Sequence, residues 1–190
     1  QQTYSVDGAY TRYMTASLVD HAIIVQSNTA TQTITIDNIS VKEIYPLSVS
    51  IAMSGMVTYA DTAPSTEAVF VTWSLDANNN IESYLLSNGA ATGQVAFLQK
   101  ASGVSDLVAT SETYFSPSVN VPFSISSRHG STFINGAVDG VALTANTTPV
   151  ALPDLSTTDL QLGKTFNGYI SDFRVWGDDL GDTGIAEASA

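Results

Sequence analysis

Three carboxylates lie within five residues near the end of the chain, at Asp178, Asp179 and Asp182. Carboxylate oxygens are hard ligands of the kind that calcium prefers, so this group is a candidate calcium site. The same residues stand where a short helix would begin, and negative side chains are favoured at the positive end of a helix. The spacing alone leaves both interpretations open.

A second series of oxygen-bearing side chains occupies residues 76–80, with the sequence Asp-Ala-Asn-Asn-Asn. Its alternation resembles a calcium loop, but Ile81 and Ser87 stand where an EF-hand loop needs its glycine and its bidentate glutamate. The pattern therefore favours a hairpin turn. On that turn Asn78 and Asn80 are candidates to hydrogen-bond a ligand.

Arg128 and His129 are followed by Gly130, between two predicted strands. Arginine and histidine can both hydrogen-bond sugar hydroxyls or an acidic polymer, so the pair is a candidate ligand-binding element. The alternative is a solvated turn without a ligand.

Aromatic side chains could offer an apolar surface on which a sugar ring stacks. Trp73 shares its strand parity with Val69 and Val71, which predicts that it packs in the core. Trp176 shares parity with Asp172 and Arg174, so it is the tryptophan that we expect on the outer or concave face and the first aromatic candidate for a ligand contact. Core packing is the alternative for Trp176 as well. Tyr84 and Tyr169 are the next candidates for a ligand contact.

The chain carries no local signature of catalysis. Glycanases use paired carboxylates that flank one bond, yet none of the five glutamates lies two or four residues from another. The two histidines, His21 and His129, are far apart and lack the partners of a metal site or a serine triad. Cysteine is absent, which removes thiol chemistry and cysteine-ligated zinc. We therefore predict a protein that is not an enzyme.

The elements that position these residues are predicted to be strands. The chain has 23 Ser and 22 Thr but only 3 Lys and 5 Glu, so residues that favour exposed helices are scarce. Apolar residues alternate with polar ones in many short segments: 34–41, 49–53, 69–75, 81–86, 95–98, 123–125, 160–162 and 169–175. We expect an all-β, antiparallel two-sheet jelly-roll sandwich.

Turn residues separate the predicted strands. Pairs that tolerate positive φ occur at residues 88–89, 102–103, 135–136 and 139–140. Residues 144–158 are predicted to form a long irregular connection. One helical signal remains, at the very end, where Asp182 could cap one or two turns that contain Ile185 and Ala188.

The charge of the chain excludes some classes of partner. Its 190 residues carry 6 basic and 18 acidic side chains, a net charge of −12. So acidic a surface repels phosphate backbones and anionic lipid headgroups, which argues against nucleic acid and membrane-surface binding. No apolar run reaches the roughly 18 residues that a membrane-spanning helix needs.

Two motifs resemble known families. Residues 124–176, which end in the sequence FNGYISDFRVW, resemble the closing strands of a concanavalin A-like (laminin G-like) jelly roll. Residues 35–44, TIDNISVKEI, resemble the last strand of a carbohydrate-binding-module-like jelly roll. Such tandem modules recur in tail fibres and spikes of bacteriophages and phage-like particles. The resemblance implies a lectin-like module on the surface of a virion that attaches to host cell-surface polysaccharide.

The resemblance and a possible break near Tyr45-Pro46 divide the chain into residues 1–45 and 46–190. We expect the first part to be the end of a preceding module, or else strands added to the main sandwich. Residue 1 is Gln, so the chain is expected to be a fragment or a processed product. The resemblance further implies a homo-oligomer, most plausibly a trimer, with other particle proteins as neighbours. Two alternative functions remain, a structural or oligomerisation domain that binds no sugar and a polysaccharide depolymerase.

Overall fold

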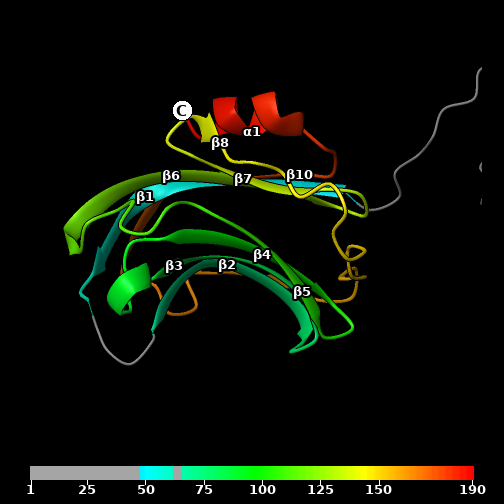
Figure 1. Cartoon of the computed structure of the whole chain (residues 1–190), viewed down its shortest axis with the longest axis horizontal. Helices are drawn as coiled ribbons and strands as arrows, with labels where there is room; N and C mark the ends of the chain where they lie inside the picture. The colour runs from blue at the N-terminus through cyan, green and yellow to red at the C-terminus, as the bar shows by residue number, and fades with distance from the viewer. Residues whose placement is uncertain (1–47, 62–65) are drawn as a thin grey trace, which may run out of the picture. The chain divides into compact units, whose positions relative to one another are not determined.

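Strands dominate the part of the chain that the computed structural model describes, residues 48–61 and 66–190. They form two five-stranded sheets in which every pairing is antiparallel (Figure 1). Sheet A has the order β10-β1-β6-β7-β8, with β10 (Gly168–Trp176), β1 (Ser48–Tyr59), β6 (Ser118–Gly130), β7 (Ile134–Val138) and β8 (Val141–Ala142). Sheet B has the order β5-β4-β3-β2-β9, with β5 (Val104–Ala109), β4 (Val95–Ala101), β3 (Asn79–Leu86), β2 (Glu67–Asp76) and β9 (Leu160–Leu162). The predicted all-β sandwich is confirmed.

Both sheets arch in the same sense, as Figure 1 shows. The outer face of sheet B is therefore concave, and the outer face of sheet A is convex. Helix α1 (Gly181–Ala188) lies on the convex face, where it contacts β6, β7 and β8. The short helix predicted at the end of the chain is thus present, and no helix of residues 48–61 and 66–190 covers the concave face. A single 3-10 turn, η1 (Gly89–Ala91), precedes β4.

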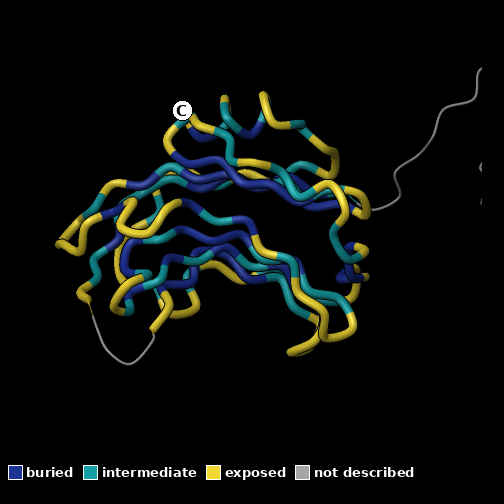
Figure 2. The backbone as a smooth tube through the Cα atoms, in the orientation of Figure 1, coloured by how far each residue is buried: buried dark blue, intermediate teal, exposed yellow. Residues whose placement is uncertain are grey.

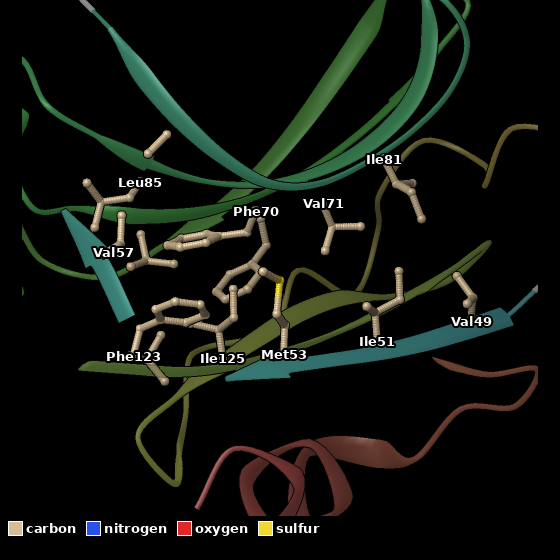
Figure 3. Packing of buried hydrophobic residues seen from close by; sticks show 14 of the residues in the cluster. Val49, Ile51, Met53, Val57, Phe70, Val71, Ile81, Leu85, Phe123 and Ile125 are labelled. Carbon is tan, nitrogen blue, oxygen red and sulfur yellow. The ribbon is translucent and has the colours of Figure 1, made fainter. Parts of the chain in front are cut away.

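The core fills the space between the two sheets. Alternate residues of each strand point inward, because successive side chains of a strand face opposite sides. Val49, Ile51 and Met53 of β1 face Val71 and other residues of sheet B (Figure 3). The rings of Phe70 and Phe123 meet across the two sheets, with centroids 4.6 Å apart. Figure 2 shows the same division, with buried backbone along the facing strands and exposed backbone in the loops and on the outer side of α1.

Strand β2 contains two bulges that the alternation did not reveal. The pairing with β3 shifts between Val69 and Val71 and again between Ser74 and Asp76. Val71 and Trp73 point into the core as predicted, but Val69 lies on the outer face opposite Tyr84. The prediction of one shared face for residues 69–75 is therefore wrong at Val69, because an extra residue in a strand reverses its parity. It is also wrong at Leu75, which lies at the second bulge and is 50% exposed.

The turn predicted at Asn135-Gly136 is wrong, since both residues lie inside β7. A Cβ at Gly136 would overlap the ring of Phe97, so the glycine permits the close approach of the opposite sheet. The side-chain amide of Asn135 donates to Leu143 O at 3.0 Å and to Asp182 Oδ1 at 2.6 Å. This Asn-Gly pair thus serves packing and hydrogen bonding within a strand.

Other predicted connections agree with the structure. The hairpin between β2 and β3 spans residues 76–79, and residues 143–159 form a long connection with a single bridge between Ile134 and Asn146. The region predicted as an N-terminal β-ribbon, residues 1–45, lies outside the described residues, and so does the strand expected at 34–41. Among the described residues, no helix combines the length and apolarity that crossing a membrane requires.

Candidate functional site

The outer face of sheet B gathers polar and aromatic side chains from three neighbouring strands. Residues directly opposite one another in an antiparallel pair share a face. The register places Tyr84 opposite Val69 and Ala96, Glu82 opposite Thr72 and Leu98, and Asn80 opposite Ser74 and Lys100. Gln161 of β9 lies opposite Thr72. We call these residues, together with Glu67 and Leu107 at the margins of the face, the concave face.

Tyr84 lies near the middle of the concave face with its side chain half buried. Burial raises the pKa of the Tyr84 hydroxyl to about 12, and the negative charges of Glu67 and Glu82 contribute to the shift. The pKa of Glu67 is also raised, first by burial and then by the charge of Glu82. Tyr84 therefore keeps its proton at physiological pH and presents a ring with a hydrogen-bond donor between two acidic residues.

Glu82 is held in place by a neighbour on the same face. The Thr72 hydroxyl donates to Glu82 Oε1 at 2.8 Å, across the β2–β3 pair. Glu82 Oε2 takes part in no hydrogen bond among the described residues and can accept one from a ligand. The Glu67 carboxylate likewise has no hydrogen-bond or ion-pair partner in this part of the chain, while Lys100 supplies a cation at the other end of the face.

Asn80 brings an unsatisfied acceptor to the concave face. Its side chain is buried, with its amide nitrogen 3.4 Å from Asp76 O and its Oδ1 atom without a partner among the described residues. Buried polar atoms are usually hydrogen-bonded, so an orphan acceptor needs an explanation such as a water or a ligand. Asn78 lies elsewhere, exposed at the tip of the hairpin, where Asp76 Oδ1 accepts from its backbone nitrogen at 2.7 Å. The hairpin interpretation of residues 76–80 is confirmed.

His129 does not reach a surface. It lies at the inward-facing end of β6, opposite Val49, and is only 1% exposed. Its Nε2 atom is 3.1 Å from the Ser127 hydroxyl, and burial lowers the pKa of the imidazole to about 3. The solvated turn expected at residues 128–130 is therefore the end of a strand, and a neutral histidine belongs to the core. The sequence contained the signal for this position, because His129 lies an even number of residues after Phe123 and Ile125, and such residues share the inward face of one strand.

Arg128 points to the convex side and is bound by the carboxylates that we considered for calcium. Its Nη1 atom is 3.0 Å from Asp179 Oδ2, its Nε atom is 2.9 Å from Asp182 Oδ1, and its guanidinium lies over the Phe133 ring at 4.5 Å. Asp178 is exposed, and its backbone oxygen accepts from the Ser50 hydroxyl. This network attaches the segment before α1 to sheet A.

The contacts thus supply an arginine as the counter-charge of Asp179 and Asp182. Asp182 lies in the first turn of α1, as the helix interpretation requires, but its side chain does not cap the helix. Within residues 48–61 and 66–190, no three His, Cys, Asp or Glu side chains gather in a way that could hold a metal ion. Calcium binding at this place remains an untested prediction.

The two tryptophans occupy different environments. Trp73 packs against the core and donates from its indole nitrogen to Leu155 O at 3.1 Å and Thr158 O at 3.0 Å. Trp176 lies opposite Ser50 at the end of β10, on the convex face that also carries Arg174. Tyr169 is exposed near the other end of the same strand. The sequence candidates therefore fall on two opposite faces: Asn80 and Tyr84 on the concave one, Trp176 and Arg128 on the convex one.

Glu67 and Glu82 were not recognised as a pair from the sequence. They are 15 positions apart, and only the β2–β3 hairpin brings them to one face. Glu67 lies opposite Leu86, four residues along β3 from Glu82. Their backbone positions are therefore roughly 13 Å apart along the strand, while Glu82 lies near enough to Glu67 for its charge to raise the pKa of that carboxyl.

Comparison with solved structures identifies proteins that share this fold. No protein-family model matches the chain, and no curated protein matches it. The chain is similar to a leech intramolecular trans-sialidase complexed with 2,7-anhydro-Neu5Ac, with 14% identity and a TM-score of 0.57 over 75% of this chain and 23% of that one. It is also similar to the CBM40 of a Ruminococcus gnavus IT-sialidase bound to α2,3-sialyllactose, with 15% identity and a TM-score of 0.56 over 76% of this chain and 83% of that one.

A third similar structure is the binding domain of botulinum neurotoxin DC in complex with SialylT. It is 16% identical with a TM-score of 0.55, over 74% of this chain and 34% of that one. The chain thus spans only about a quarter to a third of the trans-sialidase and toxin chains but most of the CBM40 chain. At these identities the likeness shows a shared fold, and that fold is a concanavalin A-like sandwich.

Proposed function

We propose that this chain is a glycan-binding module that holds its ligand on the concave face without cleaving it. The observation that carries the proposal is a half-buried Tyr84 ring on the same face as the buried Oδ1 atom of Asn80, which has no hydrogen-bond partner among the described residues. An aromatic ring offers apolar area to the flat side of a sugar, and polar atoms around it fix the orientation of the sugar hydroxyls.

Two further features support this function. Thr72 and Glu82 lie next to Tyr84 on the concave face, and Lys100 lies beside Asn80 farther along β3, so the face offers groups that can accept or donate hydrogen bonds. The similar structures include a CBM40 bound to sialyllactose and a toxin binding domain in complex with SialylT. The fold shared with them is compatible with glycan binding, although fold alone does not determine function.

The finer proposal concerns the biological setting. The resemblance of residues 124–176 and 35–44 to modules of tail fibres and spikes supports a receptor-binding module that recognises host cell-surface polysaccharide. In this proposal the protein is on the surface of a phage or phage-like particle, as a homo-oligomer. Several copies would then bind one polysaccharide together, which raises the overall avidity of weak single sites.

A pair of matched variants tests the binding proposal. We expect Tyr84→Ala to weaken binding of a glycan found on an array of purified polysaccharides and oligosaccharides by about fivefold, since an aromatic contact contributes on the order of 1 kcal/mol. Tyr169→Ala removes an exposed tyrosine from the opposite face and should leave binding unchanged. Intrinsic fluorescence and melting temperature serve to confirm that both variants fold.

Four results would contradict this proposal. If the folded chain binds no glycan on the array, the alternative of a structural or oligomerisation domain is favoured. Equal loss in both variants would show that the concave face is not the site, and loss only in Trp176→Ala would move the site to the convex face. Release of reducing ends from a bound polysaccharide would show that the chain cleaves its ligand.

A further inference from the structure

The charges on the concave face restrict the chemistry of its ligand. We infer that this face selects glycans without acidic groups and discriminates against sialylated ones. This inference rests on the proposed glycan-binding function and deepens it, because it names the class of sugar that the site accepts. It separates this chain from the similar structures whose names include a sialylated ligand.

The first step is the local charge around Tyr84. Glu67 and Glu82 approach the ring closely enough for both charges to raise the pKa of its hydroxyl, and Glu82 also raises that of Glu67. The carboxylate of a sialic acid stacked on Tyr84 would meet the same two charges. Lys100, opposite Asn80 in the register, brings a basic side chain to the end of the concave face that lies away from Glu67.

The second step is the position of the arginines. Arginine binds a carboxylate through two parallel hydrogen bonds and is the favoured partner of acidic ligands. In residues 48–61 and 66–190, both arginines project from the convex side of sheet A. Arg128 is bound by Asp179 and Asp182, and Arg174 is 2.7 Å from Asp172. Neither guanidinium can therefore serve a ligand on the concave face.

The third step is what the two glutamates can do for an uncharged sugar. An ionised carboxylate only accepts hydrogen bonds, and the hydroxyls of a neutral sugar are donors. Glu82 already accepts from Thr72 through Oε1, which leaves Oε2 for a ligand hydroxyl. In the part of the chain that the structure describes, the buried Oδ1 of Asn80 is a second acceptor without a donor. The face thus presents several acceptors that match hydroxyl groups and reject acidic ones.

Glycan pairs that differ by one acidic group test the inference directly. The full chain is titrated with pairs of array glycans that share a core and differ only in a terminal sialic acid or uronic acid. We expect the neutral member of each bound pair to bind roughly five- to tenfold more tightly at low salt. In a partly solvated site, the repulsion between a ligand carboxylate and a glutamate a few ångströms away weakens binding by about this factor. High salt should narrow the difference.

Two charge-matched variants show whether the glutamates cause the selectivity. Glu82→Gln keeps the Oε1 acceptor for Thr72 and removes one negative charge from the concave face, so the preference for the neutral member should fall severalfold. Asp172→Asn makes the same change of net charge on the convex face and should leave the preference unchanged.

The possible failures are distinguishable. Tighter binding of the acidic member, with loss in Tyr84→Ala, would overturn this inference and leave the proposed function standing. An equal response to Glu82→Gln and Asp172→Asn would show that net charge rather than this face sets the preference, which also overturns it. No binding to any neutral or acidic glycan would count against the proposed function, and the inference would fail with it.

Discussion

Replacement of the buried histidine gives a quantitative test of the core. His129 is enclosed between the sheets, and burial lowers its pKa from 6.5 to about 3. The unfolded chain binds a proton at pH values below 6.5, whereas the folded chain does not bind it until pH approaches 3. The fold therefore loses stability as pH falls through this window. Linkage with these two pKa values gives a loss of about 2 kcal/mol between pH 7 and pH 5.

The assay compares the wild-type chain with His129→Leu by urea unfolding at pH 7 and pH 5. Trp73 is a suitable fluorescent reporter, since its indole is hydrogen-bonded at the edge of the core. Carboxylates titrate in both proteins, so the difference between the two pH dependences isolates the histidine. The wild-type chain should lose about 2 kcal/mol more than the variant. Identical pH dependences would refute the burial of a neutral imidazole.

Three further predictions concern packing and the segment before α1. Gly136→Ala should destabilise the fold by about 1–3 kcal/mol, because the added Cβ would overpack against Phe97. Gly177→Ala is the control and should leave the stability unchanged, since its Cβ meets open space. Equal melting temperatures of the two variants would contradict this packing. Arg128→Met should lower the free energy of unfolding by about 1–2 kcal/mol, because two partly exposed carboxylates lose their shared counter-charge. Chemical denaturation measures this loss, and an unchanged free energy of unfolding would show that the ion pairs do not stabilise the fold. Millimolar calcium should leave the melting temperature unchanged, since Arg128 already lies between those carboxylates, and a clear rise would instead restore the calcium interpretation.

Period-two alternation predicted the sandwich because each strand buries one face against a single core. The prediction holds for β1, where Val49, Ile51 and Met53 all point inward. It fails at Val69, since a bulge inserts a residue and leaves no local mark in the sequence. It also fails at Asn135-Gly136, where a pair typical of turns serves the close approach of a ring from the other sheet. Bulges and close contacts depend on the partner strand, which a single sequence does not show.

The candidate site was less predictable than the fold for a related reason. Tyr84 and Asn80 were identified as residues of the right chemistry, but nothing in the sequence indicated that they share a face with Glu67. The acidic residues near α1 were identified by their spacing, while their partner Arg128 is more than fifty positions away. Spacing along the chain predicts which residues are neighbours within one helix or strand. Contacts between different strands, or between a strand and a helix, depend instead on how the strands are ordered within the sheets.

The central claim is that a glycan binds on the concave face. Backbone amide shifts of the isotopically labelled chain, followed by NMR during titration with a glycan bound on the array, test it most directly. We expect the largest shifts along β3, at Asn80, Glu82 and Tyr84, with little change along β10. Shifts confined to β10 around Arg174 and Trp176, or no shifts at saturating glycan, would contradict it.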